Sequence, residues 1–326
     1  MNEEITQLFA AAIKRHASDI YLLPRQDDYE ISLSYAGEFH SYQKLSQAKA
    51  RQMVNFFKFK ADMSLSERRR PQLGAWTYQT EATTVFCRLA SVGTFLDQES
   101  VVIRLIYQQN ATNNGYFFQE QFQQILAACY KRGLVLFAGP MGSGKTTAMY
   151  HFAKQLGDKL VMTIEDPVEI YEPHFLQLQV NDQAQMSYES LLTAALRLHP
   201  DVFVIGEIRN EQTAAIAVKA ALSGHLVLST VHAQNVYGVF LRLLNLGVSP
   251  ADLDQTVQLV SYQRLIETTT DQQKVLFDLL SLDETSWAQI KQKKRGKMTD
   301  EWAKNLAICF QQGQITAATQ AKYALG

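Results

Sequence analysis

The sequence predicts an α/β protein in two parts, a mostly parallel sheet flanked by helices and a smaller α+β domain before it. After residue 116, short apolar runs alternate with helical patterns, which indicates strands buried on both faces of a parallel sheet. Before residue 107, short strands follow one another with few helices between them, as in antiparallel sheets. The length of 326 residues also fits two domains.

The first predicted domain, residues 1–107, begins with a helix over 4–16 whose apolar side chains recur on one face. A turn from Pro24 to Asp28 separates the first two strands. The polar, asparagine-rich stretch 108–115 is interpreted as a linker. The other elements expected in this domain are strands over 19–23 and 29–35, a helix over 46–60, and strands near 74–80, 83–91 and 99–106.

The second predicted domain, residues 116–326, alternates helices with strands that are apolar throughout. From about 251 to 326 we expect a mostly helical part. The elements expected before it are helices over 118–131, 146–156, 188–198 and 211–222, and strands over 134–138, 160–164, 202–206 and 226–231.

Composition narrows the class of protein. The net charge of −1 disfavours nucleic acid as the main ligand, because phosphate-binding surfaces are usually basic. Cys87, Cys129 and Cys309 are far apart and form no CxxC pair, so we expect reduced thiols and no zinc. The acidic N-terminus does not resemble a signal peptide, and no run of about 18 apolar residues is present to span a membrane.

A glycine-rich loop carries the strongest chemical signal. It has the pattern GxxxxGK[ST], between an apolar strand and a helix. In this pattern backbone N–H groups and the helix N-terminus bind phosphate, the lysine contacts the β- and γ-phosphates, and the hydroxyl contacts Mg²⁺. The residues of the predicted ATP-binding loop are Gly139, Pro140, Met141, Gly142, Ser143, Gly144, Lys145, Thr146 and Thr147.

Two acidic segments follow, each after an apolar strand. In parallel sheets the carboxyl ends of strands collect ligands. Glu165 and Asp166 could therefore reach Mg²⁺ or its water shell, and the alternative is a solvated pair before Pro167. Glu207 follows a strand that resembles a Walker B segment with Gly206 in place of aspartate. It is the candidate to orient the attacking water, and the alternative is an exposed strand end.

Two histidines, His225 and His232, bracket the next apolar strand. Their spacing does not favour a metal site, and each alone is as consistent with an ordinary structural histidine.

Together these four segments resemble the secretion and type IV pilus traffic ATPases. The order matches that family's Walker A loop, aspartate box, atypical Walker B segment and histidine box. The stretches 18–24, Ser-Asp-Ile-Tyr-Leu-Leu-Pro, and 67–74, Glu-Arg-Arg-Arg-Pro-Gln-Leu-Gly, resemble two further family motifs. The resemblance covers residues 10–265.

The resemblance implies a homo-hexameric, cytoplasmic ATPase at the inner face of the cell membrane, with a PAS-like N-terminal domain and a RecA-like C-terminal domain. Its partner would be a polytopic membrane platform protein, with no direct nucleic-acid contact. Arg88 and Arg104 stand where the family has arginines that approach the phosphates, and Arg209 also matches a family position. His232, together with His225, would sense the γ-phosphate.

The chain lacks the four-cysteine zinc subdomain found in part of the family, and its N-terminal segment is short. In both respects it resembles the competence branch, which assembles a DNA-uptake pseudopilus. Pilus retraction and type II secretion remain alternatives, as does a nucleotide-gated scaffold that barely hydrolyses. A DNA or RNA motor is disfavoured by the charge. The basic run from Lys291 to Lys297 is interpreted as a solvated helix end, the alternatives being contact with anionic lipid or an acidic loop.

Overall fold

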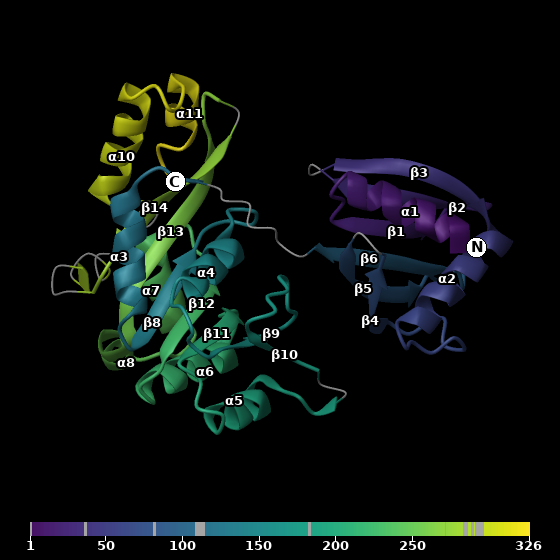
Figure 1. Cartoon of the computed structure of the whole chain (residues 1–326), viewed down its shortest axis with the longest axis horizontal. Helices are drawn as coiled ribbons and strands as arrows, with labels where there is room; N and C mark the ends of the chain where they lie inside the picture. Colours follow the sequence, from purple (N-terminus) through teal and green to yellow (C-terminus); the bar gives the residue numbers. More distant parts are fainter. Residues whose placement is uncertain are drawn as a thin grey trace. The chain divides into compact units, whose positions relative to one another are not determined.

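The computed structural model describes residues 2–35, 38–80, 83–107, 115–181, 184–270, 272–282, 286–287, 290 and 297–326. The chain divides into two compact units, Met1–Asn110 and Ala111–Gly326 (Figure 1). The predicted linker lies outside the described residues except for Gly115, as does the basic run except for Lys297. Within the described residues, no helix combines the length and apolar character needed to cross a bilayer.

The smaller unit is an antiparallel sheet in the order β3-β2-β1-β6-β5-β4. Two helices pack their apolar residues on it, and Phe9 of the first stacks on Tyr78 with ring centroids 4.3 Å apart. The elements are α1 (Asn2–Lys14), β1 (Asp19–Pro24), β2 (Asp28–Tyr35), β3 (Glu38–Ser46), α2 (Gln47–Lys60), β4 (Gln72–Gln79), β5 (Thr84–Gly93) and β6 (Glu99–Tyr107).

Strand β3 was not predicted from the sequence. It lies at the edge of the sheet, and only Leu45 among its residues is buried. Without a buried face, the strand shows no alternation of apolar and polar residues to mark it.

The larger unit contains a sheet in the order β10-β9-β11-β12-β8-β13-β14-β7. The first six strands of this order run parallel, and β14 is antiparallel to β13. The predicted mostly parallel α/β sheet is thereby confirmed. Its strands are β7 (Gly115–Tyr116), β8 (Gly133–Ala138), β9 (Val161–Glu165), β10 (Leu176–Gln179), β11 (Val202–Glu207), β12 (Leu226–Val231), β13 (Val257–Glu267) and β14 (Gln273–Leu280).

Helices cover both faces of this sheet (Figure 1). Helices α3 and α4 share one apolar cluster with the strands, and α5 to α8 share the other. A further cluster joins α10, together with Ile315 and Tyr323 on either side of α11, to β13 and β14. The helices are α3 (Gln119–Cys129), α4 (Lys145–Lys154), α5 (Tyr188–Leu196), α6 (Glu211–Leu222), α7 (Val236–Asn245), α8 (Pro250–Thr256), α10 (Asp300–Gln311) and α11 (Ala317–Lys322).

The prediction of a mostly helical part from about 251 is wrong over residues 257–267 and 273–280, which form β13 and β14. Two features of the sequence explain the error. Strand β13 carries buried polar residues, Ser261 and Gln263, which interrupt the apolar run expected of an internal strand. In β14 the apolar residues are spaced as on a helix face, although both sides of the strand are covered.

The parallel register brings the carboxyl ends of four strands to one edge of the sheet. Val231 at the end of β12 pairs with Ala138 at the end of β8, and Glu207 of β11 pairs with Thr230. Ile205 pairs with Ile164, one residue before the end of β9. Side chains that leave these strands are therefore neighbours.

Candidate nucleotide site at the carboxyl edge of the larger sheet

The loop between β8 and α4 has the backbone of a phosphate cradle. Gly139, Gly142 and Gly144 all have positive φ, at 146°, 74° and 80°. At Gly139 an added Cβ would also lie 2.6 Å from the backbone oxygen of Gln263, so only glycine fits. Gly144 is the N-cap of α4, and this places the helix N-terminus directly after the loop.

Lys145 is folded back over this loop. Its ammonium donates a hydrogen bond to the carbonyl oxygen of Pro140 at 2.9 Å, and only 8% of the residue is exposed. Burial lowers the pKa of Lys145, whereas the carboxylates of Glu207 and Glu169 raise it. A cation held here against a desolvation cost is well placed to bind an anion.

The first turn of α4 carries Thr146 and Thr147. The Thr146 hydroxyl donates to Oε2 of Glu169 at 3.1 Å. Glu169 belongs to the segment around Glu165 and Asp166, but no pattern in the sequence distinguishes it as a site residue. A hydroxyl beside a carboxylate offers the oxygen ligands that Mg²⁺ prefers, so these residues fit the metal expected here.

Glu165 lies at the end of β9 and is 1% exposed. Its Oε1 accepts a hydrogen bond from the Tyr150 hydroxyl at 2.5 Å, and Gln177 donates to that hydroxyl at 2.8 Å. A Cβ added to Gly206, on the neighbouring strand, would lie 3.0 Å from Cγ of Glu165. The Glu165 side chain therefore lies against the position where a Walker B strand usually carries aspartate.

Asp166 and Arg209 join the ends of two neighbouring strands. The Arg209 guanidinium donates a short, charge-assisted hydrogen bond to Oδ2 of Asp166. The next residue, Asn210, is the N-cap of α6, and its side chain accepts from the N–H of Thr213 at 2.9 Å. Asparagine is among the residues that cap helix N-termini most effectively, so Asn210 stabilises the start of α6 directly after Arg209.

Glu207 and His232 approach one another at the ends of β11 and β12. His232 Nε2 lies 3.6 Å from Oε1 of Glu207, and both side chains are partly exposed. Glu207 also contributes to the electrostatic environment of Lys145. The structure thus gathers Lys145, Thr146, Glu207 and His232 at one edge of the sheet.

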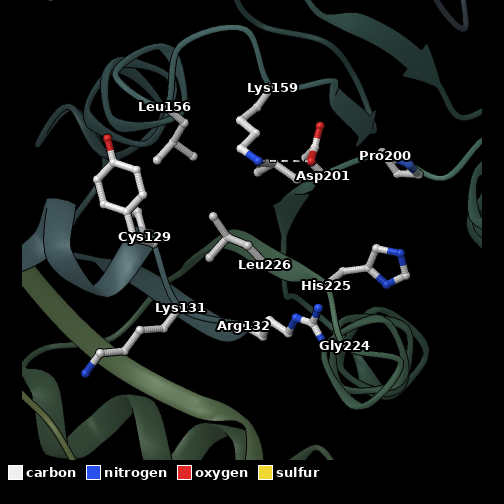
Figure 2. A pocket seen from close by; sticks show the side chains of 12 residues that line it. Cys129, Lys131, Arg132, Leu156, Lys159, Pro200, Asp201, Gly224, His225 and Leu226 are labelled. Atoms are coloured by element: carbon white, nitrogen blue, oxygen red, sulfur yellow. Dashed lines mark hydrogen bonds and ion pairs between the residues drawn. The ribbon is translucent and has the colours of Figure 1, made fainter.

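The structure does not bring His225 to this edge, which corrects the prediction that pairs it with His232. His225 precedes β12 and His232 follows it, so the strand separates them by about 20 Å at roughly 3.3 Å per residue. His225 lies in the wall of a hollow of about 350 Å³ at the opposite edge, with Arg132 and the Lys159–Asp201 pair (Figure 2).

The basic residues of this hollow have a structural explanation. Helices α3, α4 and α6 all end near it, at Cys129, Lys154 and Leu222. The negative ends of helix dipoles favour nearby cations, which accounts for Lys131 and Arg132 just after α3.

Arg88 and Arg104 lie in the smaller unit, directly opposite one another on β5 and β6. Arg104 Nε donates to Oδ1 of the buried Asp19 at 3.0 Å. Asp19 belongs to the stretch 18–24 that resembles a family motif, so this aspartate has a structural role within its own unit.

The second family-like stretch in the smaller unit is also held by internal contacts. The Glu67 carboxylate accepts from the backbone N–H groups of Arg69 and Arg70, at 2.8 and 3.0 Å. The buried Lys58 donates to the Glu67 carbonyl at 2.5 Å and pairs with Glu99 at 2.7 Å. These contacts fix the loop before β4.

The remaining candidates for metal or thiol chemistry are few. No group of three or more His, Cys, Asp or Glu side chains is arranged around a metal position in the described part of the chain. Cys87, Cys129 and Cys309 are buried, and burial raises their pKa values to about 12, 12 and 11. These thiols stay protonated at neutral pH.

A glycine-rich loop at the carboxyl edge of a mostly parallel sheet, with a buried lysine, defines the class of P-loop nucleotide-binding proteins. A family model described as "Type II/IV secretion system protein" matches residues 1–316. The chain belongs to this family, and the resemblance drawn from its motifs is confirmed.

Curated relatives are similar over most of the chain. The competence protein ComGA of Streptococcus pneumoniae is 41% identical over 268 residues, which cover 82% of this chain and 85% of the relative. ComGA of Bacillus subtilis is 35% identical over 266 residues, covering 80% and 74%. The type IV pilus assembly ATPase PilB of Thermus thermophilus is 34% identical over 281 residues, covering 83% and 31%.

Solved structures share the fold. The Legionella pneumophila ATPase DotB has a TM-score of 0.74 at 18% identity, covering 98% of this chain and 95% of that one. The pilus retraction motor PilT with bound ADP has a TM-score of 0.72 at 20% identity, covering 97% and 95%.

Proposed function

We propose that this chain hydrolyses ATP as a motor subunit of a pilus-type machine. The observation that carries the proposal is the convergence of Lys145, Thr146, Glu207 and His232 at one edge of the larger sheet. ATP is the substrate, held by its phosphates on the loop 139–147. Lys145 leaves the Pro140 carbonyl to contact them, because a phosphate is a stronger acceptor than a neutral carbonyl.

Mg²⁺, when bound, would neutralise charge on the β- and γ-phosphates. Thr146 is its proposed protein ligand, with Glu169 beside it and Asp166 within the same segment. Glu165 is proposed to support the metal site indirectly, because its buried side chain lies against Gly206, where a Walker B strand usually carries aspartate.

Glu207 is the proposed residue that orients water for attack on the γ-phosphate. It is partly exposed, so water can reach it, and His232 lies 3.6 Å from it. His232 would then respond to whether the γ-phosphate is present, through its contact with Glu207. Arg88, Arg104 and Arg209 remain predicted contributors to phosphate or interface contacts.

We further propose that the chain acts as a homo-hexamer on a polytopic membrane platform protein, at the cytoplasmic face of the membrane. Residues 116–326 would form the RecA-like motor domain and residues 1–107 the PAS-like domain. The proposed task is assembly of a competence pseudopilus, and it is supported by similarity to competence proteins ComGA along most of their length.

Phosphate release by the purified full chain with ATP and Mg²⁺ tests this proposal. Glu207→Ala is expected to remove nearly all turnover while ATP still binds, since the loop is untouched. Glu211→Gln, an exposed carboxylate on the first turn of α6, serves as the matched control and should turn over normally. Wild-type protein that binds ATP without releasing phosphate would instead indicate a nucleotide-gated scaffold.

A further inference from the structure

A buried polar side chain from β13 touches the phosphate loop from behind. Gln263 is 0% exposed, and its Nε2 donates a hydrogen bond to the carbonyl oxygen of Ser143 at 2.7 Å. Strand β13 runs parallel to β8 with Tyr262 opposite Ala138. The next residue of β13 therefore lies beside the point where β8 becomes the loop.

Gln263 contacts both ends of the loop. A Cβ added to Gly139 would lie 2.6 Å from the backbone oxygen of Gln263. A Cβ added to Gly144 would lie 3.6 Å from Nε2 of the Gln263 side chain. Gln263 therefore bounds the inner side of the loop, together with Leu265 beside Gly144.

Gln263 is not the residue that stability alone would favour here. Neither its Oε1 nor the hydroxyl of Ser143 has a hydrogen-bond partner among the described protein atoms, and both are buried. A buried polar atom without a partner is destabilising. An apolar side chain of similar size would avoid the cost at Oε1, although it would also remove the donor to the Ser143 carbonyl. Stability alone therefore gives the amide little advantage here, and its effect on the loop is the better explanation.

The effect of the Gln263 amide on the loop follows from the planarity of the Ser143–Gly144 peptide bond. In a trans peptide the C=O of Ser143 and the N–H of Gly144 point in opposite directions. Because the Gln263 amide holds this carbonyl on the inner side, the Gly144 N–H is turned outward, to the side where a phosphate would bind.

We propose that Gln263 is a positioning residue for the phosphate loop, which fixes the Ser143–Gly144 peptide in its anion-binding orientation. The inference rests on the proposed nucleotide site and deepens it. Without this hydrogen bond the peptide is free to rotate, and the nucleotide must order it on binding.

Calorimetric titration of the full chain with ADP and Mg²⁺ tests the proposal. Gln263→Met keeps the length of the side chain and removes the donor. We expect ADP to bind about 5- to 30-fold more weakly, as for loss of one loop hydrogen bond. The thermal midpoint without nucleotide should change little, because loss of the donor to Ser143 is offset by removal of the unpaired Oε1. If Gln263 had a purely structural role, Gln263→Met would lower the ADP affinity and the thermal midpoint together.

Gln258→Met is the matched control, on the same strand but beside Gly133 at the opposite edge of the sheet. It should leave ADP affinity unchanged. Gln263→Glu, which presents oxygens to the Ser143 carbonyl, should weaken ADP at least as much as Gln263→Met.

The outcomes separate the two proposals. If wild-type protein does not bind ADP, the proposed function is wrong. If wild-type protein and Gln258→Met bind ADP and a folded Gln263 variant binds within twofold of them, only the positioning role is wrong. An equal loss in Gln258→Met would also refute it.

Discussion

Gly206 occupies a position in β11 where the side chain of Glu165, on the neighbouring strand, leaves little room for a side chain. An added Cβ would lie 3.0 Å from Cγ of Glu165, which is closer than ordinary van der Waals contact, and 3.4 Å from its Cα. Glu165 is buried and bound to Tyr150, so it cannot move aside freely. Gly206→Ala should therefore lower the free energy of unfolding by about 1–3 kcal/mol, the usual cost of overpacking.

A double-mutant cycle assigns this cost to one contact. In the Glu165→Ala background, Gly206→Ala should cost at least about 1 kcal/mol less than in wild type, because contacting residues are not additive. Gly206→Asp should be more harmful than alanine in wild type, since it adds a second carboxylate beside Glu165. It should be better tolerated once Glu165 is removed.

Thermal unfolding followed by far-UV circular dichroism, without nucleotide, measures these costs. A unit of this size should lose about 2–4 °C in midpoint per kcal/mol. Gly238→Ala is the control, because its added Cβ would meet nothing closer than 3.4 Å. A Gly206→Ala protein as stable as wild type, or a cost that persists without Glu165, would refute the packing argument.

Two further predictions concern buried charge. Burial raises the pKa of Asp278 to about 6, against hydrogen bonds from Thr299 that lower it. The protonated form of Asp278 is thus favoured in the folded state, so its contribution to the free energy of unfolding is present below about pH 4 and lost as pH rises through about 6. Asp278→Asn should remove up to about 3 kcal/mol of this pH dependence. The measurement is the difference from wild type in urea unfolding at pH 4 and at pH 7. Lys58→Ala should lower the free energy of unfolding by about 3–5 kcal/mol, because it leaves Glu99 unpaired, and Glu99→Leu in addition should recover part of that loss in the same assay.

The strands and helices that the sequence predicted well are those with one clear apolar pattern. The strand expected over 226–231 is β12 with the same bounds, since all six residues are buried. Strand β10 was missed because none of its four residues is buried. Strand β13 was mistaken for part of a helical region because its polar residues face the protein interior, where only tertiary contacts explain them.

The same limit applies to the site. The loop 139–147 is local in sequence and was predicted whole. Glu169 and Gln263 acquire their importance only through partners, Thr146 and Ser143, that are 23 and 120 residues away. His225 was grouped with His232 by their common segment, but a strand between them carries the two to opposite edges.

Calorimetric titration of ATP into the full chain with Mg²⁺ tests the central claim most directly. Saturable binding of ATP is expected in wild type, and Lys145→Ala should abolish most of it without lowering the thermal midpoint. If the folded wild-type protein takes up no ATP, or if Lys145→Ala binds it equally well, the loop 139–147 is not the nucleotide site and the account is contradicted.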